Sequence, residues 1–501
     1  MKLIHPRISQ RLLISLVMGS TLVVPGLVPA QAQDQPSQTP QMLQMQKKLD
    51  ELEQQMRDLR QQMDAAQQEQ ALETAARQEQ AKENAAQQEK AKENPPQAQP
   101  SLTPEQAAAA TAISEKSEPG EEAAPIPPKS VEIYGFAMMD SGYNFGTINP
   151  DWFDVVRPTK LPAFKGEFGA DGQTYFGVRQ TRFGVKSYTP TSMGDLTTIF
   201  EFELYGTGVD AGQTTFRLRH AWGQLGKFGA GQTWSPFMDI GVFPDSIEYW
   251  GPNGMAFFRN VQVRWTPVEK GDSNVQIALE RPGASADGGA YSGRVELANI
   301  VPQFKWPDLS GHVKYAGSWG YVQVAGIVRK MAWVDTGTGP YHLSGSAVGA
   351  GINVSSNLKI TKNDLGKFSF VYGNGIENYM NDAPVDVGVQ NNFSNPISPI
   401  KGVALPVLGV VAFDDHTWNK RYSTSFGYSM LNISNSDGQL PSDFHRGQYG
   451  LANLLYRPVP KVMMGGEFQF GQRENISNGY TYNDFRVQFS FKYDWSKDFK
   501  F

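Results

Sequence analysis

Residues 131–501 consist of short segments in which apolar and polar side chains alternate with a period of two, separated by clusters of Gly, Asn, Asp and Pro. In one segment Leu196 and Phe200 share a face, while Glu201 and Glu203 lie on the other. A period of two points successive side chains to opposite faces of a strand. This region is therefore predicted to be all-β, with charges on one face of strand after strand.

The same separation recurs in the segment where Phe216, Leu218 and Trp222 oppose Arg217 and Arg219. The last segment sets aromatic side chains from Phe485 to Trp495 against Arg486, Gln488 and Lys492. A strand face this aromatic suits a barrel that is apolar outside and polar inside. Long and short connectors alternate along the region, which predicts an antiparallel transmembrane barrel of 16 strands, wide enough for an aqueous channel.

The N-terminal sequence predicts export from the cytoplasm, as an outer-membrane barrel requires. A basic start, an apolar run and Ala30 and Ala32 in an A-x-A arrangement predict a secretory signal peptide over residues 1–32. After it, no apolar run approaches the roughly 18 residues of a membrane-spanning helix. The chain has no Cys and a formal net charge of −5, which excludes disulfides and gives no support for a nucleic-acid partner.

Residues 33–94 have a different texture, rich in Gln, Ala, Glu and Lys. An apolar 3–4 spacing predicts a coiled-coil seam, followed by three near-copies of a ten-residue unit that predict a solvated helical spacer; a disordered tether is the alternative. Residues 95–129 are rich in Pro and Ala and are expected to be a linker. The seam residues are Met42, Met45, Leu49, Leu52, Met56, Leu59 and Met63.

Several motifs resemble known porins. TRFGVKS from Thr181, GDLTTIFEFEL from Gly194 and RHAWGQLGKFGAGQ from Arg219 resemble general trimeric porins. YGNGIENYM from Tyr372, HTWNKRYSTSFGY from His416 and the segment ANLLYRPVPKVMMGGEFQFGQREN that begins with residue 452 resemble the DcaP-like porin family.

This resemblance implies a 16-stranded homotrimer in the outer membrane of a Gram-negative bacterium, with a helical periplasmic N-terminal segment and a role in uptake of dicarboxylates and similar anions. It also implies that residues 235–258 fold into the barrel and narrow it, with Asp239, Asp245 and Glu248 as the acids of this constriction loop. The decapeptide repeats have no counterpart in the family pattern.

A diffusion channel works through the side chains that set the width and the field at its narrowest point. By strand parity the candidates face inward, together with Arg259 where the constriction loop meets the next strand; the alternative is that such charges only keep the lumen wet. Glu201 and Glu203 also point inward, against an anion preference. The candidate cations are Arg182, Lys186, Arg217, Arg219, Arg259, Arg264, Lys314, Arg329, Arg421, Arg473, Arg486 and Lys492.

The remaining expectations concern partners and alternatives. We expect outer-membrane lipids, small anionic solutes and, through the N-terminal helix, the cell wall as partners, and Phe501 as a membrane-insertion signal. No cofactor or metal is predicted, because no histidine pair has H-x-x-x-H spacing. The sequence contains no G-x-S-x-G motif, which argues against an outer-membrane hydrolase. A structural protein that links the outer membrane to the cell wall remains an alternative.

Overall fold

The computed structural model of the chain describes residues 129–501. The predicted signal peptide, the coiled-coil seam, the decapeptide repeats and the linker up to residue 128 lie outside this range. Within it, no helix combines the length and the hydropathy needed to cross a membrane.

Within the described residues, eighteen strands form one antiparallel sheet. They are β1 (Ser130–Asn144), β2 (Gln173–Gly177), β3 (Arg182–Thr191), β4 (Gly194–Tyr205), β5 (Thr214–Leu225), β6 (Phe228–Trp234), β7 (Arg259–Lys270), β8 (Ser273–Glu280), β9 (Ile300–Pro302), β10 (Asp308–Gly317), β11 (Gly320–Asp335), β12 (Gly345–Lys359), β13 (Asp364–Asn374), β16 (Pro406–Thr417), β17 (Tyr422–Ile433), β18 (Phe444–Tyr456), β19 (Val462–Asn475) and β20 (Thr481–Lys500).

Shorter elements occupy the connections between these strands. A separate two-stranded sheet and seven 3-10 turns make up this set: β14 (Val387–Asn391), β15 (Ile400–Ala404), η4 (Pro150–Trp152), η5 (Pro158–Lys160), η6 (Gly208–Asp210), η7 (Ile240–Val242), η8 (Gly289–Tyr291), η9 (Val295–Asn299) and η10 (Glu377–Tyr379).

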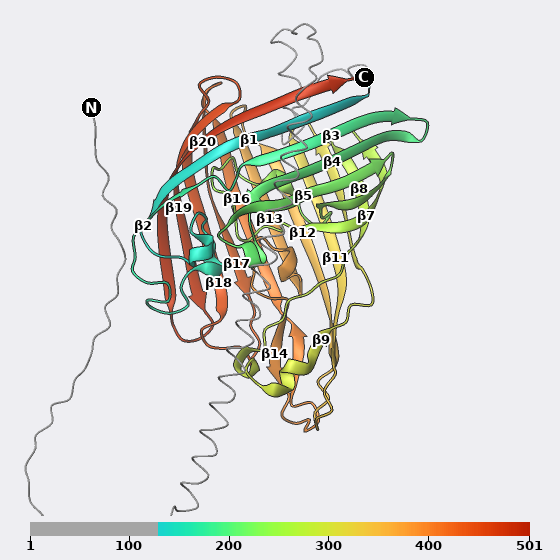
Figure 1. Cartoon of the computed structure of the whole chain (residues 1–501), viewed down its shortest axis with the longest axis vertical. Helices are drawn as coiled ribbons and strands as arrows, with labels where there is room; N and C mark the ends of the chain where they lie inside the picture. The colour runs from blue at the N-terminus through green and yellow to red at the C-terminus, as the bar shows by residue number, and fades with distance from the viewer. Residues whose placement is uncertain (1–128) are drawn as a thin grey trace, which may run out of the picture. The chain divides into compact units, whose positions relative to one another are not determined.

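The sheet closes on itself, because β1 pairs with β20 from Ser130↔Lys500 to Asn144↔Arg486; Figure 1 shows the two strands side by side. Strands β2 and β3 pair with successive stretches of β1. Strands β9 and β10 likewise share the edge of β11. The eighteen strands therefore occupy 16 positions around the barrel, which confirms the predicted 16-stranded antiparallel, all-β fold.

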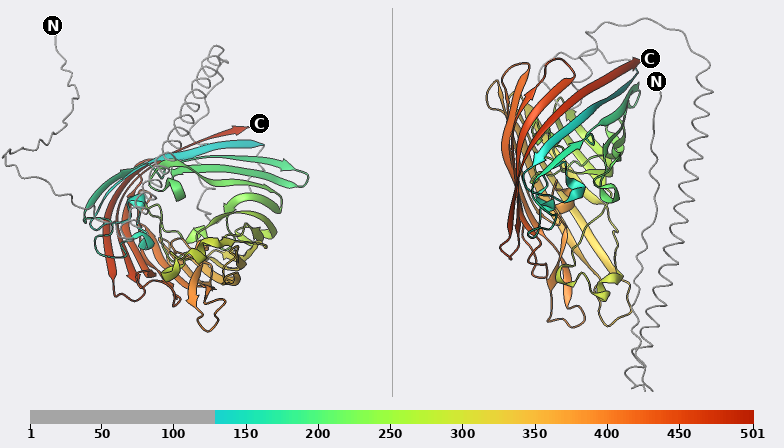
Figure 2. Two further views of the ribbon diagram at one scale, coloured as in Figure 1. Left: turned by 60° about the horizontal axis from the view of Figure 1, so that its bottom comes forward. Right: turned by 60° about the vertical axis from the view of Figure 1, so that its left-hand side comes forward.

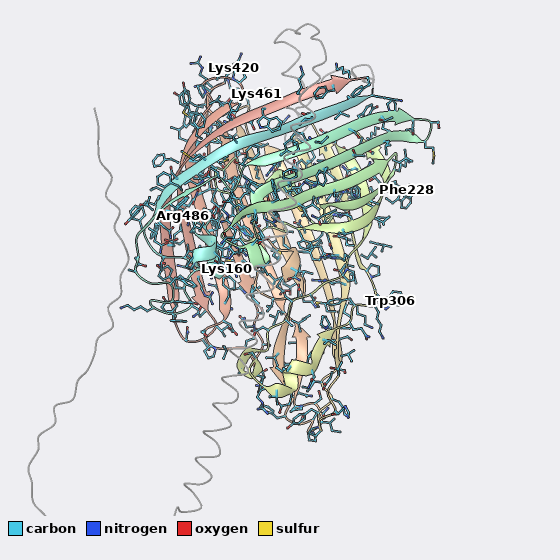
Figure 3. All side chains as sticks on the ribbon, in the orientation of Figure 1. Lys160, Phe228, Trp306, Lys420, Lys461 and Arg486 are labelled. Carbon is cyan, nitrogen blue, oxygen red and sulfur yellow. The ribbon has the colours of Figure 1, made fainter. Side chains whose placement is uncertain are left out.

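Short turns and long loops gather at opposite ends of the strands, and Figure 2 shows the barrel from two further sides. Lys420 and Lys461, in two of the turns, lie at what we name the turn end (Figure 3). The other end is the loop end. Its loops are L1 (145–172), L2 (206–213), L3 (235–258), L4 (281–307), L5 (336–344), L6 (375–405), L7 (434–443) and L8 (476–480).

The outer surface of the barrel is apolar, as the alternation predicts. Phe200, Trp265 and Phe489 are each about half exposed, between 44% and 62%, and Phe228 projects outward in Figure 3. Exposed aromatic and β-branched side chains on strand after strand are what a lipid-facing surface requires.

The inner surface is less polar than the alternation predicts. Phe237 and Met238 of L3 and Tyr379 of L6 pack against inward-facing Val371 and Val407 in a buried apolar cluster. Long loops that enter a barrel need an apolar wall to pack on, since loop backbone and side chains must also bury surface. A hydrophobic core therefore lies inside the barrel, between the loops and strands β11–β18.

One predicted orientation is wrong. The register of β4 and β5 shifts between Glu201↔His220 and Phe202↔Leu218, so a β-bulge leaves Arg219 without an opposite residue and reverses the parity that follows. Trp222, predicted to face outward with Leu218, is buried, and the Arg264 guanidinium lies 4.4 Å from its ring centroid.

Candidate functional site

Loop L3 connects β6 to β7 and follows the inner wall of the barrel. Near its start, Asp239 accepts hydrogen bonds from Tyr321 of β11 (2.9 Å) and Ser355 of β12 (2.6 Å). Farther along, Ser246 donates to Glu467 of β19 (2.9 Å). The tip then reaches β4, where the Tyr249 hydroxyl donates to Glu203. The loop is thus attached to strands on several sides of the barrel.

The other two acids predicted in L3 are also bonded to the protein. Asp245 forms an ion pair with Arg457 at 2.9 Å. Glu248 accepts a hydrogen bond from the backbone N–H of Val156 in L1 (3.0 Å) and another from Gly251. Burial raises the pKa of Glu248 to about 7. Of the three carboxylates, Asp245 is paired with a cation, burial favours the neutral form of Glu248, and Asp239 is held by neutral hydroxyl donors.

Beside the tip of L3, two glutamates of β4 form ion pairs with arginines from neighbouring strands. Arg219 donates from Nε to Glu201 at 2.6 Å and from Nη1 to Glu203 at 2.7 Å. Glu203 is fully buried, and its carboxylate also lies 3.6 Å from a guanidinium nitrogen of Arg182. A buried carboxylate is tolerated when it is paired and hydrogen-bonded in this way.

Two further arginines complete this group. Arg217 Nη1 and Arg259 Nη2 lie 3.8 Å and 3.7 Å from Glu203 Oε1. We name the set of Arg182, Arg217, Arg219, Arg259, Glu201 and Glu203 the arginine cluster. With four guanidinium groups and two carboxylates it carries a formal charge of about +2. The Arg217 side chain keeps 29% of its surface exposed, against 5% for Arg219.

Tyr249 joins L3 to the arginine cluster. Its hydroxyl donates to Glu203 and accepts a hydrogen bond from Arg217 Nη1 at 3.3 Å. Its ring stacks on Tyr205 of β4, with centroids 3.9 Å apart and planes 7° from parallel. Because stacking and the hydroxyl both hold this ring, the loop tip is fixed beside Arg217.

Closer to the turn end, four predicted cations remain partly exposed. Arg264 donates to Gln276 at 2.8 Å, Lys186 lies over the ring of Tyr134 and Lys314 over that of Tyr321, and Lys492 forms an ion pair with Asp494 at 3.1 Å. Among residues 129–501, Arg264, Lys186 and Lys314 make no ion pair within 4.0 Å.

Three other predicted cations are buried against the long loops. Arg329 pairs with Asp308 of β10 and Asp386 of L6 at 3.2 and 2.8 Å. Arg473 donates to carbonyl groups of L1 and L7, and Arg486 donates to the carbonyl group of Phe153 in L1 at 2.9 Å. Strand parity alone predicted exposed lining residues here, whereas the structure covers them with loops.

Arg421 does not lie on a strand. It lies in the exposed turn 418–421 at the turn end, before β17 begins, so the prediction that it faces inward from a strand is wrong. Phe501 follows β20, and its backbone N–H donates to the carbonyl group of Lys129 at 2.9 Å.

Sequence reasoning missed a second arginine site, inside L1. The guanidinium of Arg157 lies between the rings of Trp152 and Trp250, 4.1 and 3.8 Å from their centroids, and pairs with Asp382 of L6 at 2.9 Å. It thereby connects L1, L3 and L6. The aromatic pair is far apart in sequence, so no local pattern indicates this contact.

The comparisons with known proteins agree with this architecture. Residues 131–493 match the family model described as DcaP outer membrane protein. The crystal structure of the outer membrane channel DcaP of Acinetobacter baumannii is similar, with 18% identity and a TM-score of 0.60, over 74% of this chain and 98% of that chain.

An anion-selective porin from Comamonas acidovorans has 10% identity and a TM-score of 0.48, over 73% of this chain and 100% of that chain. No curated protein matches the sequence.

Proposed function

Because the chain belongs to the DcaP outer membrane protein family, we propose that it is a porin: a passive diffusion channel for small hydrophilic solutes, with a preference for anions such as dicarboxylates. The family is one of outer-membrane proteins and not of enzymes. A barrel of 16 positions with an apolar outer surface has the size that leaves room for a lumen.

The observation that carries the anion preference is the arginine cluster beside the tip of L3. Its two glutamates are outnumbered by four arginines. The acids of L3 offset little of this excess, since Asp245 is paired with Arg457, Glu248 is buried, and Asp239 lies against β11 and β12 rather than at the cluster. The positive excess is therefore available to a solute, and guanidinium groups bind carboxylates through paired hydrogen bonds.

Within this proposal Arg217 makes the first contact, because it is the most exposed of the four arginines. Lys186, Arg264, Lys314 and Lys492 line the route toward the turn end. Glu201 and Glu203 orient the arginines rather than attract cations, since each is buried beneath them. Arg329, Arg473 and Arg486 hold loops in place.

The proposed assembly is a homotrimer surrounded by outer-membrane lipids. Bacterial barrels have short periplasmic turns and long extracellular loops, so the turn end faces the periplasm and the loop end faces outward. Both Ser130 and Lys500 lie at the turn end, which supports the proposal that the N-terminal segment extends into the periplasm toward the cell wall.

Planar-bilayer recordings under a salt gradient test this function. We expect conductance steps in groups of three, a reversal potential of the sign for anion selectivity, and block by succinate. Arg217→Ala is expected to shift the reversal potential toward cations and weaken the block, whereas Arg421→Ala, a matched loss of charge outside the strands, leaves both unchanged.

Cation selectivity in the unaltered protein, or equal effects of the two substitutions, would refute the proposed role of the cluster. Absence of conductance would favour the envelope tether, and deletion of residues 33–129 separates the two functions, because a porin keeps conducting without them.

A further inference from the structure

Three side chains with metal-binding chemistry meet on the outer surface near the turn end. Asp364 begins β13 and is the register partner of His416 on β16, and Asp414 lies two residues before His416 on the same face. The two residues of β16 on either side of Asp414, Phe413 and Asp415, face inward and are buried. Strands β13 and β16 thus place two carboxylates and one imidazole side by side on the outer surface of the barrel.

The geometry of this group is compact. One potential ligand atom from each of the three residues lies within 4.8 Å of the other two. His416 Nδ1 and Asp364 Oδ1 are 2.5 Å apart, while Asp414 Oδ1 is buried without a hydrogen-bond partner. Within residues 129–501, neither aspartate forms an ion pair with a lysine or an arginine.

The surroundings of the two carboxylates are partly apolar. On the same outward face, Phe368 and Phe426 are exposed, as expected for a lipid-facing band. Trp418 packs edge-on against His416 with centroids 4.2 Å apart, and aromatic side chains of this kind mark the membrane interface. Two carboxylates this close repel each other in such surroundings, so a cation that binds both of them is favoured.

We propose that Asp364, Asp414 and His416 bind a divalent transition-metal ion of the Zn²⁺ class. Imidazole with carboxylate oxygens suits such ions, whereas Mg²⁺ and Ca²⁺ prefer oxygen ligands alone. At ligand distances of about 2.1 Å the donor atoms sit roughly 3.4 Å apart, so the group closes by a small side-chain movement. Binding displaces the proton shared by His416 and Asp364, and water completes the coordination.

Such an ion would join two separate turns of the barrel. Asp364 follows the turn 360–363, and His416 precedes the turn 418–421. The backbone pairing of β13 with β16 ends at this point, and the Thr417 N–H extends it with a hydrogen bond to the carbonyl group of Asn363 at 2.8 Å. The metal would add a side-chain link at the end of this backbone pairing, independent of the pore.

Calorimetric titration of the chelator-stripped full-length protein with ZnCl2 in detergent tests the site. We expect one Zn²⁺ per chain, unaffected by excess Mg²⁺, and loss of that site in Asp414→Asn and His416→Gln. His445→Gln is the matched control, because the His445 ring lies away from the proposed site, with Nδ1 3.0 Å from the amide oxygen of Asn435. This variant should still bind one Zn²⁺ per chain. Zn²⁺ should raise the Tm of the unaltered protein and of this control alone.

Circular dichroism establishes that each variant has folded. If the unaltered protein takes up no Zn²⁺, the three residues form a hydrogen-bonded group and the proposal is wrong. It is equally wrong if Asp414→Asn and His416→Gln bind Zn²⁺ as the unaltered protein does.

Discussion

Arg219 connects the two buried glutamates of β4, donating one hydrogen bond to Glu201 at 2.6 Å and another to Glu203 at 2.7 Å. The bulge in β5 makes this possible, because it aims Arg219 and His220 inward together. The contact that organises the arginine cluster thus depends on one irregularity in the sheet.

Replacement of Arg219 by Ala should destabilise the barrel strongly. It leaves Glu203 and Glu201 buried with weaker compensation, and removal of one partner of a buried ion pair costs about 3–5 kcal/mol. Unfolding in urea measures the change. Arg217→Ala, which removes a more exposed partner at 3.8 Å, should cost less than about 1 kcal/mol; equal losses would show that Arg219 does not hold the cluster together.

Replacement of Trp222 by Ala tests the reversed parity of β5. Because Trp222 is buried inside the barrel, we expect a loss of about 3–5 kcal/mol. Trp265 faces outward and is 44% exposed, so Trp265→Ala in the same detergent should cost much less. The opposite order of stabilities would place Trp222 on the lipid-facing surface.

The barrel should lose stability as pH rises through neutrality. Burial raises the pKa of Glu248 from 4.5 to about 7, so its contribution is complete below about pH 4.5 and is lost as pH rises through about 7. The difference corresponds to on the order of 3 kcal/mol. Thermal unfolding between pH 4 and 9 measures this trend, and Glu248→Gln, which stays neutral, should flatten it. An unchanged slope in this variant would assign the trend to other groups.

Replacement of Arg157 by Ala should release loop L1. Its partner Asp382 is almost fully buried, and the rings of Trp152 and Trp250 lose the cation between them. We expect about 3 kcal/mol of lost stability and faster proteolysis within residues 145–172. Arg294→Ala, which breaks an exposed ion pair with Glu296, is the control and should leave proteolysis unchanged.

Strand alternation was sufficient to determine the barrel, its strand number and most of its outward face, because each strand repeats the same period-two choice between lipid and interior. Val261, Val263 and Trp265 are exposed as that pattern requires. The motif evidence likewise identified the family, which the match over residues 131–493 confirms.

Tertiary structure decided what the interior contains. Strand parity predicts which face of the sheet a side chain lies on, but not how deeply it is buried. It could not separate partly exposed Arg217 from buried Arg329 and Arg486, which L6 and L1 cover. A bulge shifts parity by one residue without a mark in the sequence, and this reversed Trp222. Long-range pairs such as Tyr249 with Glu203 and Asp364 with His416 arise only when the sheet closes, because closure brings distant segments together.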